Sequence, residues 1–598
     1  MKKRLLMSGF AFALGMAAAV ATFPASALAC GGFFCMNVPM DQAGEKIVFS
    51  FDGDMVTAVI QIQFAGEAKE FSWVLPLPSE PLQDGGMEIG SEELFTRLLQ
   101  NTNPTFTVNW DTSNGCYPYW GQQMWDGAPT AGGAPEDDGE NGVVVLQIKE
   151  VGPFDAAVVK SDDPAALSAW LNENGYTQPP EAEELIAYYV AQENVFVALK
   201  LQQDKGAGDI APISVTFKEP QGPCIPMVLT RIAATENMPV YAWILDSGRT
   251  IPKNYFHVTP NWAQVTWLDG GLNYVDLVTK AIDEAAGHGF VTDYAGSSEI
   301  MKEKLVWEGR FANVETLKSY TNPAEFYWQM LNVGLPVNSQ TQNLIRKYIP
   351  TPPDWTGSDQ EFYCCLDQYA EYLATLNFDP VAFTDEIVEV IVKPIEKGQA
   401  LLDSRPYLTR LFTTMSPNEM TRDPIFVVDS TLPDVSNQHV AQGVAECEQG
   451  ENGSQMVTKV TLTLEDGTVV TYDGNWNVWD SPPNAEAMVG GATADSQPAA
   501  TEIASIGDDG KLTPVESDLV AFTDQQLAFV DGASPPAPGD NIQPVGNNLP
   551  GGTTDGTKTS KGKSGCSMAR GFSGVGGILV VLSLVVAVVR RRRNSLNR

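Results

Sequence analysis

The chain has 598 residues and a formal charge of −37, which comes from 37 basic and 74 acidic side chains. Hydrophobic residues make up 43% of it, enough for a packed core, and its length exceeds that of one ordinary domain. A surface this acidic repels nucleic acid and anionic lipid headgroups. The net charge therefore argues against functions that depend on binding polyanions.

The N-terminus predicts an export signal over residues 1–29. Residues 2–4 form a positive n-region, residues 5–21 an apolar h-region, and Ala27-Leu28-Ala29 matches a small-x-small cleavage site. Cleavage would leave Cys30 as the new N-terminus, where it is a candidate for lipidation or for a disulfide bond. The preceding leucine lies one place too near the cysteine for the usual lipoprotein pattern, which disfavours lipidation.

Hydrophobic periodicity predicts a mixed α+β, strand-rich ectodomain with an inserted helical pair and a helix-rich middle. Alternation of apolar and polar residues predicts a half-buried strand at 56–64. Further strands, rich in β-branched or aromatic residues, are predicted at 71–75, 143–148, 195–201 and 213–217. Capping residues and helical periodicity predict helices: the pair 162–175 and 181–191, then 273–286, then a helix-rich stretch from 314 to about 400. An Asp-Gly turn between 460–464 and 469–472 predicts a β-hairpin.

The composition along the chain predicts six segments. They are a signal peptide (1–29), a mixed α+β part (30–310), a helix-rich part ending in a β-hairpin (311–485), a flexible stalk that is first acidic and then rich in Gly, Ser, Thr and Pro (486–570), a transmembrane helix (571–589) and a basic cytoplasmic tail (590–598).

The C-terminus predicts a membrane anchor. Residues 571–589 carry no charge and would rise about 28 Å as a helix, close to the hydrocarbon thickness of a bilayer. Four arginines follow at 590–593 and favour a cytoplasmic tail. We therefore expect the rest of the chain to be exported and to face the exterior, in the periplasm or on the outer cell surface.

A short motif precedes this helix. Gly565-Cys566, the apolar helix and the arginine cluster together resemble the tripartite MYXO-CTERM-type surface-sorting segment. The resemblance implies cleavage or modification near Cys566 by a membrane protease, followed by display on the outer surface.

The chain has eight cysteines, and an oxidising exterior favours disulfide bonds between them. The candidates are Cys35, Cys116, Cys224, Cys364, Cys365 and Cys447, and their connectivity stays open. Cys364 and Cys365 are neighbours in sequence. We expect them to bridge two different partners, because a ring between adjacent cysteines is strained.

Several motifs of the body resemble one bacterial family. They are Cys30–Cys35 (CGGFFC), Phe71–Pro76 (FSWVLP), Val151–Asp155 (VGPFD) and Phe290–Gly296 (FVTDYAG). Together they are similar to the family catalogued as domain of unknown function number 2330, over roughly residues 30–430. The resemblance implies an exported, often surface-anchored protein, and it supplies no activity and no catalytic residues.

The sequence offers no catalytic, cofactor-binding or metal-binding motif. It contains no H-E-x-x-H helix, no phosphate loop, and no G-x-S-x-G elbow in the ectodomain. The acidic loops Asp52-Gly53-Asp54 and 136–141 have oxygen ligands that suit calcium, but solvated loop charge is the simpler interpretation. Glu284 and His288 lie four residues apart, and Gly287 between them is expected to end their helix.

Aromatic residues in a Gly- and Pro-rich loop form the candidate binding surface: Tyr117, Tyr119, Trp120 and Trp125. We expect a non-catalytic, membrane-anchored surface protein that binds, adheres or scaffolds, with a glycan or a surface protein as its partner. The alternative is a surface hydrolase that acts on polysaccharide or peptide through carboxylates. A cleft with two carboxyls about 5–9 Å apart would favour this alternative.

Overall fold

The computed structural model describes most of the chain between residues 33 and 528. The described ranges are 33–34, 41–65, 72–116, 144–176, 182–202, 210–219, 224–301, 305–450, 454–478, 486–507 and 511–528. Within them the fold is mixed α+β, as predicted, with twelve α-helices beside large sheets. No helix in these ranges is long and apolar enough to cross a membrane, and the predicted signal and anchor lie outside them.

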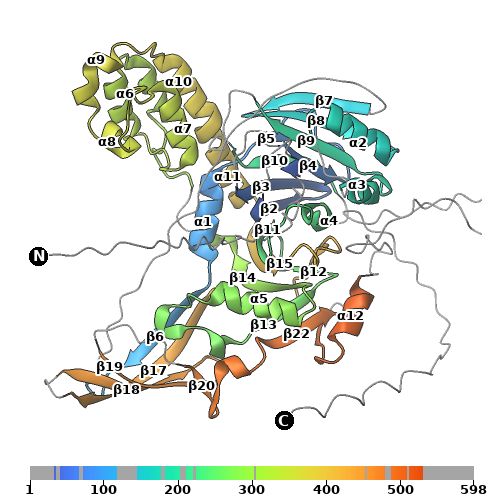
Figure 1. The fold of residues 1–598 in the computed structure, drawn as a ribbon, viewed down its shortest axis with the longest axis vertical. Helices are drawn as coiled ribbons and strands as arrows, with labels where there is room; N and C mark the ends of the chain where they lie inside the picture. Colours follow the sequence, from blue (N-terminus) through green and yellow to red (C-terminus); the bar gives the residue numbers. More distant parts are fainter. Residues whose placement is uncertain are drawn as a thin grey trace, which may run out of the picture.

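A ten-stranded central sheet organises the molecule (Figure 1). Its strand pairs are antiparallel except for β2 with β11 and β13 with β14, which are parallel. In spatial order the strands are β23 (Leu512–Pro514), β22 (Ala500–Ile506), β13 (Phe256–Pro260), β14 (Gly289–Ser297), β15 (Tyr407–Met415), β11 (Met238–Asp246), β2 (Asp41–Asp52), β3 (Met55–Ala65), β10 (Ile213–Lys218) and β5 (Met87–Ile89). Segments from both sides of residue 310 therefore share one sheet.

The β2–β3 hairpin shows how sequence sets this sheet. Gly53 has φ +66°, a left-handed conformation that glycine adopts at little cost, and it lets Asp52 pair with Met55 across the turn. Val56, Ala58 and Ile60 are buried on one face of β3, which confirms the predicted strand.

A five-stranded upper sheet packs face to face on the central sheet. Its order is β1 (Phe33–Phe34), β4 (Ser72–Leu77), β9 (Val195–Leu201), β8 (Phe154–Lys160) and β7 (Val144–Val151). Leu75 and Val197 of this sheet share one buried cluster with Ile47 and Val215 of the central sheet. The outer face is covered by α2 (Pro164–Glu173), α3 (Ala182–Val190) and α4 (Met227–Thr230). The predicted helical pair is confirmed, and Asp163 caps α2 by accepting a hydrogen bond from the Ala165 N–H.

The other face of the central sheet carries the helical unit, residues 323–403 with α1 beneath them (Figure 1). Phe326 and Phe383 are buried within it, and Trp243 of β11 reaches the same cluster. The helix-rich stretch predicted from residue 314 is confirmed. Its helices are α6 (Pro323–Met330), α7 (Ser339–Tyr348), α8 (Asp359–Tyr363), α9 (Ala370–Leu373), α10 (Pro380–Ile387) and α11 (Lys393–Asp403), and α1 (Glu92–Thr102) packs with them.

A six-stranded lower sheet forms the opposite end of the molecule. Its order is β21 (Ala492–Thr493), β20 (Met488–Val489), β19 (Val469–Asn477), β18 (Gln455–Thr463), β17 (Gln438–Gln449) and β6 (Thr105–Asp111), and β17 pairs in parallel with β6. The predicted hairpin is β18–β19, with Gly467 at φ +86° in its turn. Helix α5 (Tyr274–Glu284) packs in the same cluster as this sheet, and β12 (Thr250–Pro252) pairs with β16 (Phe426–Val428).

The first part of the predicted stalk is folded. Strand β22 joins the central sheet beside β13, and α12 (Val520–Leu527) packs with both of its end residues buried. Composition suggested a linker here because the segment is rich in small residues. Ala499 and Ala504 are nevertheless 4% and 1% exposed, since small side chains fit a closely packed contact.

Candidate functional site

Four exposed apolar side chains lie within residues 307–337, where the chain enters the helical unit. Trp307, Trp328, Leu331 and Val337 are 49%, 36%, 52% and 91% exposed, and we call them the tryptophan patch. Trp328 and Leu331 lie three residues apart at the end of α6, so they face the same side. A Cβ at Gly334 would lie 3.6 Å from Trp307, which places this ring beside the segment that follows Leu331.

Trp307 is held in place from beneath by Arg310. The guanidinium of Arg310 lies 4.4 Å from the Trp307 ring centroid and 4.5 Å from that of Phe311. It donates to both carboxylate oxygens of Glu93 on α1, at 3.1 and 2.6 Å, and to the Gly334 carbonyl at 2.8 Å. The exposed indole therefore rests on a fixed cation, and little conformational entropy remains to be lost when a ligand stacks on it.

Exposed polar residues lie near these tryptophans in sequence. Glu308 follows Trp307, Gln329 follows Trp328, and Asn332 lies four residues after Trp328. The Asn332 amide already donates to the Trp328 carbonyl at 3.0 Å. Indole faces flanked by amide and carboxylate groups can stack a sugar ring and hydrogen-bond its hydroxyls.

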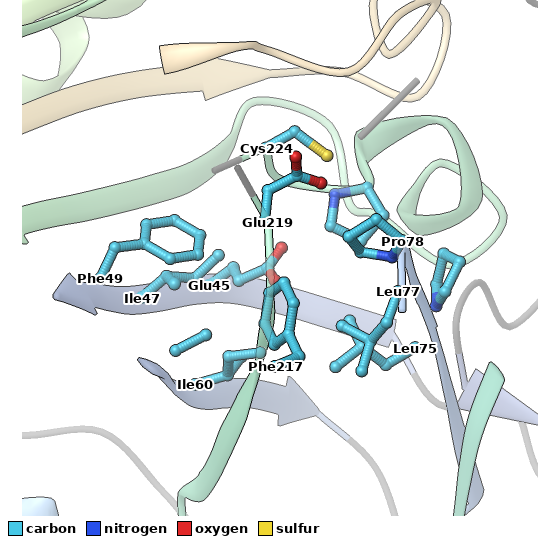
Figure 2. A pocket seen from close by; sticks show the side chains of 13 residues that line it. Glu45, Ile47, Phe49, Ile60, Leu75, Leu77, Pro78, Phe217, Glu219 and Cys224 are labelled. Carbon is cyan, nitrogen blue, oxygen red and sulfur yellow. The ribbon is translucent and has the colours of Figure 1, made fainter. Parts of the chain in front are cut away.

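A second candidate is a cavity between the central and upper sheets (Figure 2). Its walls are mainly apolar, and two carboxylates, those of Glu45 and Glu219, line it and are 3% exposed each. The Glu219 carboxyl lies next to the side chain of Cys224. The remaining lining residues are Ile47, Phe49, Ala58, Ile60, Leu75, Pro76, Leu77, Pro78, Phe217 and Pro226.

The size of this cavity decides what it can do. It measures about 20 Å³, which is room for about one water molecule. Neither Glu45 nor Glu219 is without an interaction partner. Glycoside hydrolysis places two carboxyls on either side of a sugar ring, and this cavity cannot admit one. We therefore interpret the pair as part of the packing between the two sheets.

A third group of titratable residues lies deep in the central sheet. Arg410 of β15 approaches Asp293 of β14 at 3.0 Å between Nε and Oδ2, with side chains 2% and 0% exposed. The hydroxyl of Tyr274 donates to the same carboxylate. Burial raises the pKa of Asp293, while the Arg410 charge and the Tyr274 hydrogen bond lower it in part. These groups are enclosed, and they join β14, β15 and α5.

Glu284 and His288, which lie four apart in sequence, face different partners. The two Glu284 oxygens accept from the backbone N–H groups of Ala499 and Ala500, at 2.8 and 3.0 Å. The His288 imidazole instead lies 3.1 Å from a carboxylate oxygen of Asp524. The pair fastens β22 and α12 to the body.

Asp524 is the anchor of α12. Its carboxylate also accepts from Arg422, and the second nitrogen of His288 contacts the Thr421 hydroxyl at 2.8 Å. Burial opposes ionisation of Asp524, but the hydrogen bond from His288 and the charges of His288 and Arg422 outweigh it and lower its pKa. Helix α12 is thus attached to the body through its contacts with Arg422 and His288.

The described residues contain no group of three or more His, Cys, Asp or Glu side chains able to hold a metal ion. Asp52, a candidate calcium ligand, is paired with Arg405 at 2.8 Å, and Asp54 lies 3.5 Å from Lys218. The acidic loop 136–141 lies outside the described part of the chain.

The cysteine candidates fall into three sets. Cys116 and Cys447 form a disulfide bond that joins the end of β6 to β17, and Cys224 is also disulfide-bonded. Cys364 and Cys365 are free thiols that face one another and do not bridge two other partners as expected. Their sulfur atoms lie 2.6 Å apart, directly after the end of α8.

Other predicted site residues lie outside the described ranges. These are Cys30, Cys35 and Cys566 and the aromatic loop residues Tyr117, Tyr119, Trp120 and Trp125. The tryptophan patch was missed because a single exposed Trp has no sequence signature. Arg310 packs against both Trp307 and Gly334, which places Trp307 beside the segment after α6, and a Trp-x-x-Arg spacing alone does not reveal this contact.

Comparison with known proteins supports the family resemblance in part. Residues 24–306 match the model of a family described as an uncharacterized protein conserved in bacteria (DUF2330). The resemblance is thereby confirmed over this range, and the match ends directly before Trp307. Neither the curated proteins nor the solved structures gave a match.

Proposed function

We propose that this protein is an exported, membrane-anchored surface protein that binds a glycan through the tryptophan patch and carries out no catalysis. The observation that carries the proposal is the pair of exposed indoles, Trp307 and Trp328, of which the first is fixed by Arg310. Preformed aromatic surfaces bind at low entropic cost, and tryptophans are prominent among residues that dominate binding energy.

The charge of the chain favours a neutral glycan as the partner. A formal charge of −37 repels polyanions, so an acidic polysaccharide or an anionic membrane would meet repulsion. Stacking on indole needs no charge, and the exposed Gln329 and Asn332 supply uncharged hydrogen-bonding groups beside the rings. A surface protein is the competing partner, and the test below separates the two.

The anchored arrangement comes from the two ends of the sequence. The export signal at 1–29 and the apolar segment at 571–589 would tether the described part outside the cell, beyond a linker. Protease added to intact cells or spheroplasts should remove most of the chain. Complete protection in both preparations would contradict this topology. The MYXO-CTERM-type segment further predicts processing near Cys566, which mass spectrometry of the mature C-terminus would detect.

The binding test uses the full-length protein in detergent micelles and an array of neutral and acidic polysaccharides, together with surface-protein extracts. The double variant Trp307→Ala/Trp328→Ala should lose neutral-glycan binding by roughly thirty-fold or more, since losing a central tryptophan costs about 2 kcal/mol. Phe522→Ala is the matched control, because Phe522 is 60% exposed on α12, away from the patch. Equal binding by both variants, or binding to protein extracts alone, would reject the glycan proposal.

The hydrolase alternative needs its own measurement. Glycosidase, esterase and peptidase substrates should remain uncleaved by the same preparation. Turnover that disappears in Glu45→Gln or Glu219→Gln would instead assign catalysis to the buried carboxylates.

A further inference from the structure

We propose that Cys364 and Cys365 form a reversible disulfide bond with each other, so that the helical unit carries a redox-sensitive site of its own. The site would react with thiols and disulfides of small molecules or proteins that reach the exterior. It does not depend on the glycan-binding proposal.

The two thiols are placed to react together. Both follow directly after α8, and their sulfur atoms lie 2.6 Å apart, closer than van der Waals contact. Cys364 is exposed and Cys365 is half-buried, so a reagent can reach the pair from solvent. Cys364 also lies near Tyr327 of α6, whose ring stacks on Tyr363 at 5.6 Å.

The other described cysteines indicate which state the pair adopts. Cys116, Cys447 and Cys224 are all disulfide-bonded. A chain that holds such bonds folds where thiols are oxidised. In that environment the two adjacent thiols meet the same oxidants, and within the described residues each has only the other as a free partner.

The reaction is a thiol–disulfide exchange. One thiolate of the pair attacks an incoming disulfide R–S–S–R, forms a mixed disulfide with one sulfur and releases the other as R–S⁻. The second cysteine loses its proton to solvent and attacks the mixed disulfide, which closes the Cys364–Cys365 bond and releases the second R–S⁻. Two protein thiols are oxidised, and one external disulfide is reduced to two thiols.

Adjacency makes this bond labile. Consecutive Cα atoms are about 3.8 Å apart, shorter than the roughly 4.4–6.8 Å usual between disulfide-bonded residues. Strained and exposed disulfides are more easily reduced than buried structural ones. Cys116, by contrast, is 2% exposed and joins strands of the lower sheet. The pair should therefore open with mild reductant while the Cys116–Cys447 bond persists.

The test uses full-length protein purified without reductant and exposed to oxidised glutathione. It is then denatured in iodoacetamide, digested and analysed by mass spectrometry. We expect the peptide with both cysteines to be unalkylated and lighter than its reduced form by two hydrogen atoms. In a dithiothreitol titration of the native protein, these two thiols should become labelled before Cys116 and Cys447.

One variant and one thiol-bridging reagent serve as controls. Cys364→Ser should leave one labelled thiol at Cys365 and unchanged circular dichroism. The reduced wild-type protein should bind one equivalent of phenylarsine oxide, which bridges two close thiols, and Cys364→Ser should not. Alkylation of both cysteines after glutathione treatment would overturn the proposal, and so would a bond from either cysteine to a different residue.

Discussion

Arg310 and Glu93 form a two-pronged ion pair that joins the loop before α6 to the first turn of α1, with side chains only 2% and 7% exposed. The same guanidinium lies 4.4 Å from the Trp307 ring centroid and 4.5 Å from that of Phe311. This buried ion pair thus fixes both the contact between the helical unit and α1 and the position of the exposed Trp307 ring. Stability and binding should therefore depend together on this pair.

Breaking the pair should destabilise the protein strongly. Glu93→Gln leaves the Arg310 cation buried without its counter-charge, and removing one partner of a buried pair costs about 3–5 kcal/mol. The free energy of unfolding from urea titration should fall by this amount.

The control replaces both partners. Glu93→Leu/Arg310→Met removes both charges of the buried pair, and Arg97, which also lies 3.4 Å from Glu93, is 24% exposed and can be solvated. Buried pairs replaced by apolar residues are often neutral in stability. The double variant should therefore be more stable than Glu93→Gln while still weakening glycan binding. If Glu93→Gln and the wild type have the same urea midpoint of unfolding, the ion pair does not stabilise the fold.

The free energy of unfolding should fall on acidification because His257 is buried in its neutral form. Burial, assisted by the nearby Arg249 charge, lowers the pKa of His257 to about 4, whereas an unfolded chain has a histidine pKa of about 6.5. Between these values the unfolded state binds a proton that the folded state does not, so stability is full above about 6.5 and falls as the pH drops toward 4. The loss should reach roughly 3 kcal/mol.

Urea unfolding of the wild type and of His257→Gln, measured from neutral pH down to about pH 5, would check this. The glutamine can still donate toward the Pro252 carbonyl that His257 contacts at 3.2 Å. The difference between the two stability curves should narrow with falling pH. Parallel curves would mean that His257 does not titrate as described.

The strands and helices with a clear period could be predicted from sequence, because burial of one face imposes that period. The hairpin at β18–β19 and the cap of α2 by Asp163 are local features and were also predictable. The parallel pairing of β6 with β17 was not, since the strands are separated by most of the chain and no local pattern encodes their register. The place of β22 in the central sheet depends likewise on distant contacts.

The site was less predictable than the fold. Cys116 and Cys447 were both among the predicted disulfide cysteines. The sequence alone could not pair them, because their pairing depends on β6 lying beside β17. Cys364 and Cys365 were expected to bridge two different partners, but both are free thiols whose sulfur atoms lie 2.6 Å apart. The tryptophan patch needs Arg310, Glu93 and Gly334 in contact, and these come from different elements.

The Cys116–Cys447 bond should contribute measurably to stability. It joins residues 331 positions apart, and removing a native disulfide typically costs about 2–5 kcal/mol. Cys116→Ser/Cys447→Ser should therefore melt several degrees lower than the wild type. The melting temperature of this variant should respond less to dithiothreitol than that of the wild type. Equal melting temperatures of the two unreduced proteins would contradict the prediction.

Two glycines with the same backbone angle form a matched pair for the last prediction. Gly271 and Gly309 both have φ +84°, where a side chain strains the backbone by about 1–2 kcal/mol. At Gly309 an added Cβ meets nothing within 4 Å, but at Gly271 it would lie 2.2 Å from the Phe106 ring. Phe106 is 5% exposed and packs edge-on against Trp267 at 5.5 Å, so it cannot easily move away.

Gly309→Ala should therefore cost only the backbone strain, whereas Gly271→Ala should cost about 1–3 kcal/mol more because of overpacking. Urea titration of both variants measures the difference directly. Gly271→Ala/Phe106→Leu should be more stable than the two single changes would sum to, since the smaller side chain makes room for the methyl group. Equal losses of unfolding free energy in the two alanine variants would contradict the prediction. They would show that Phe106 can move to accommodate the added methyl group.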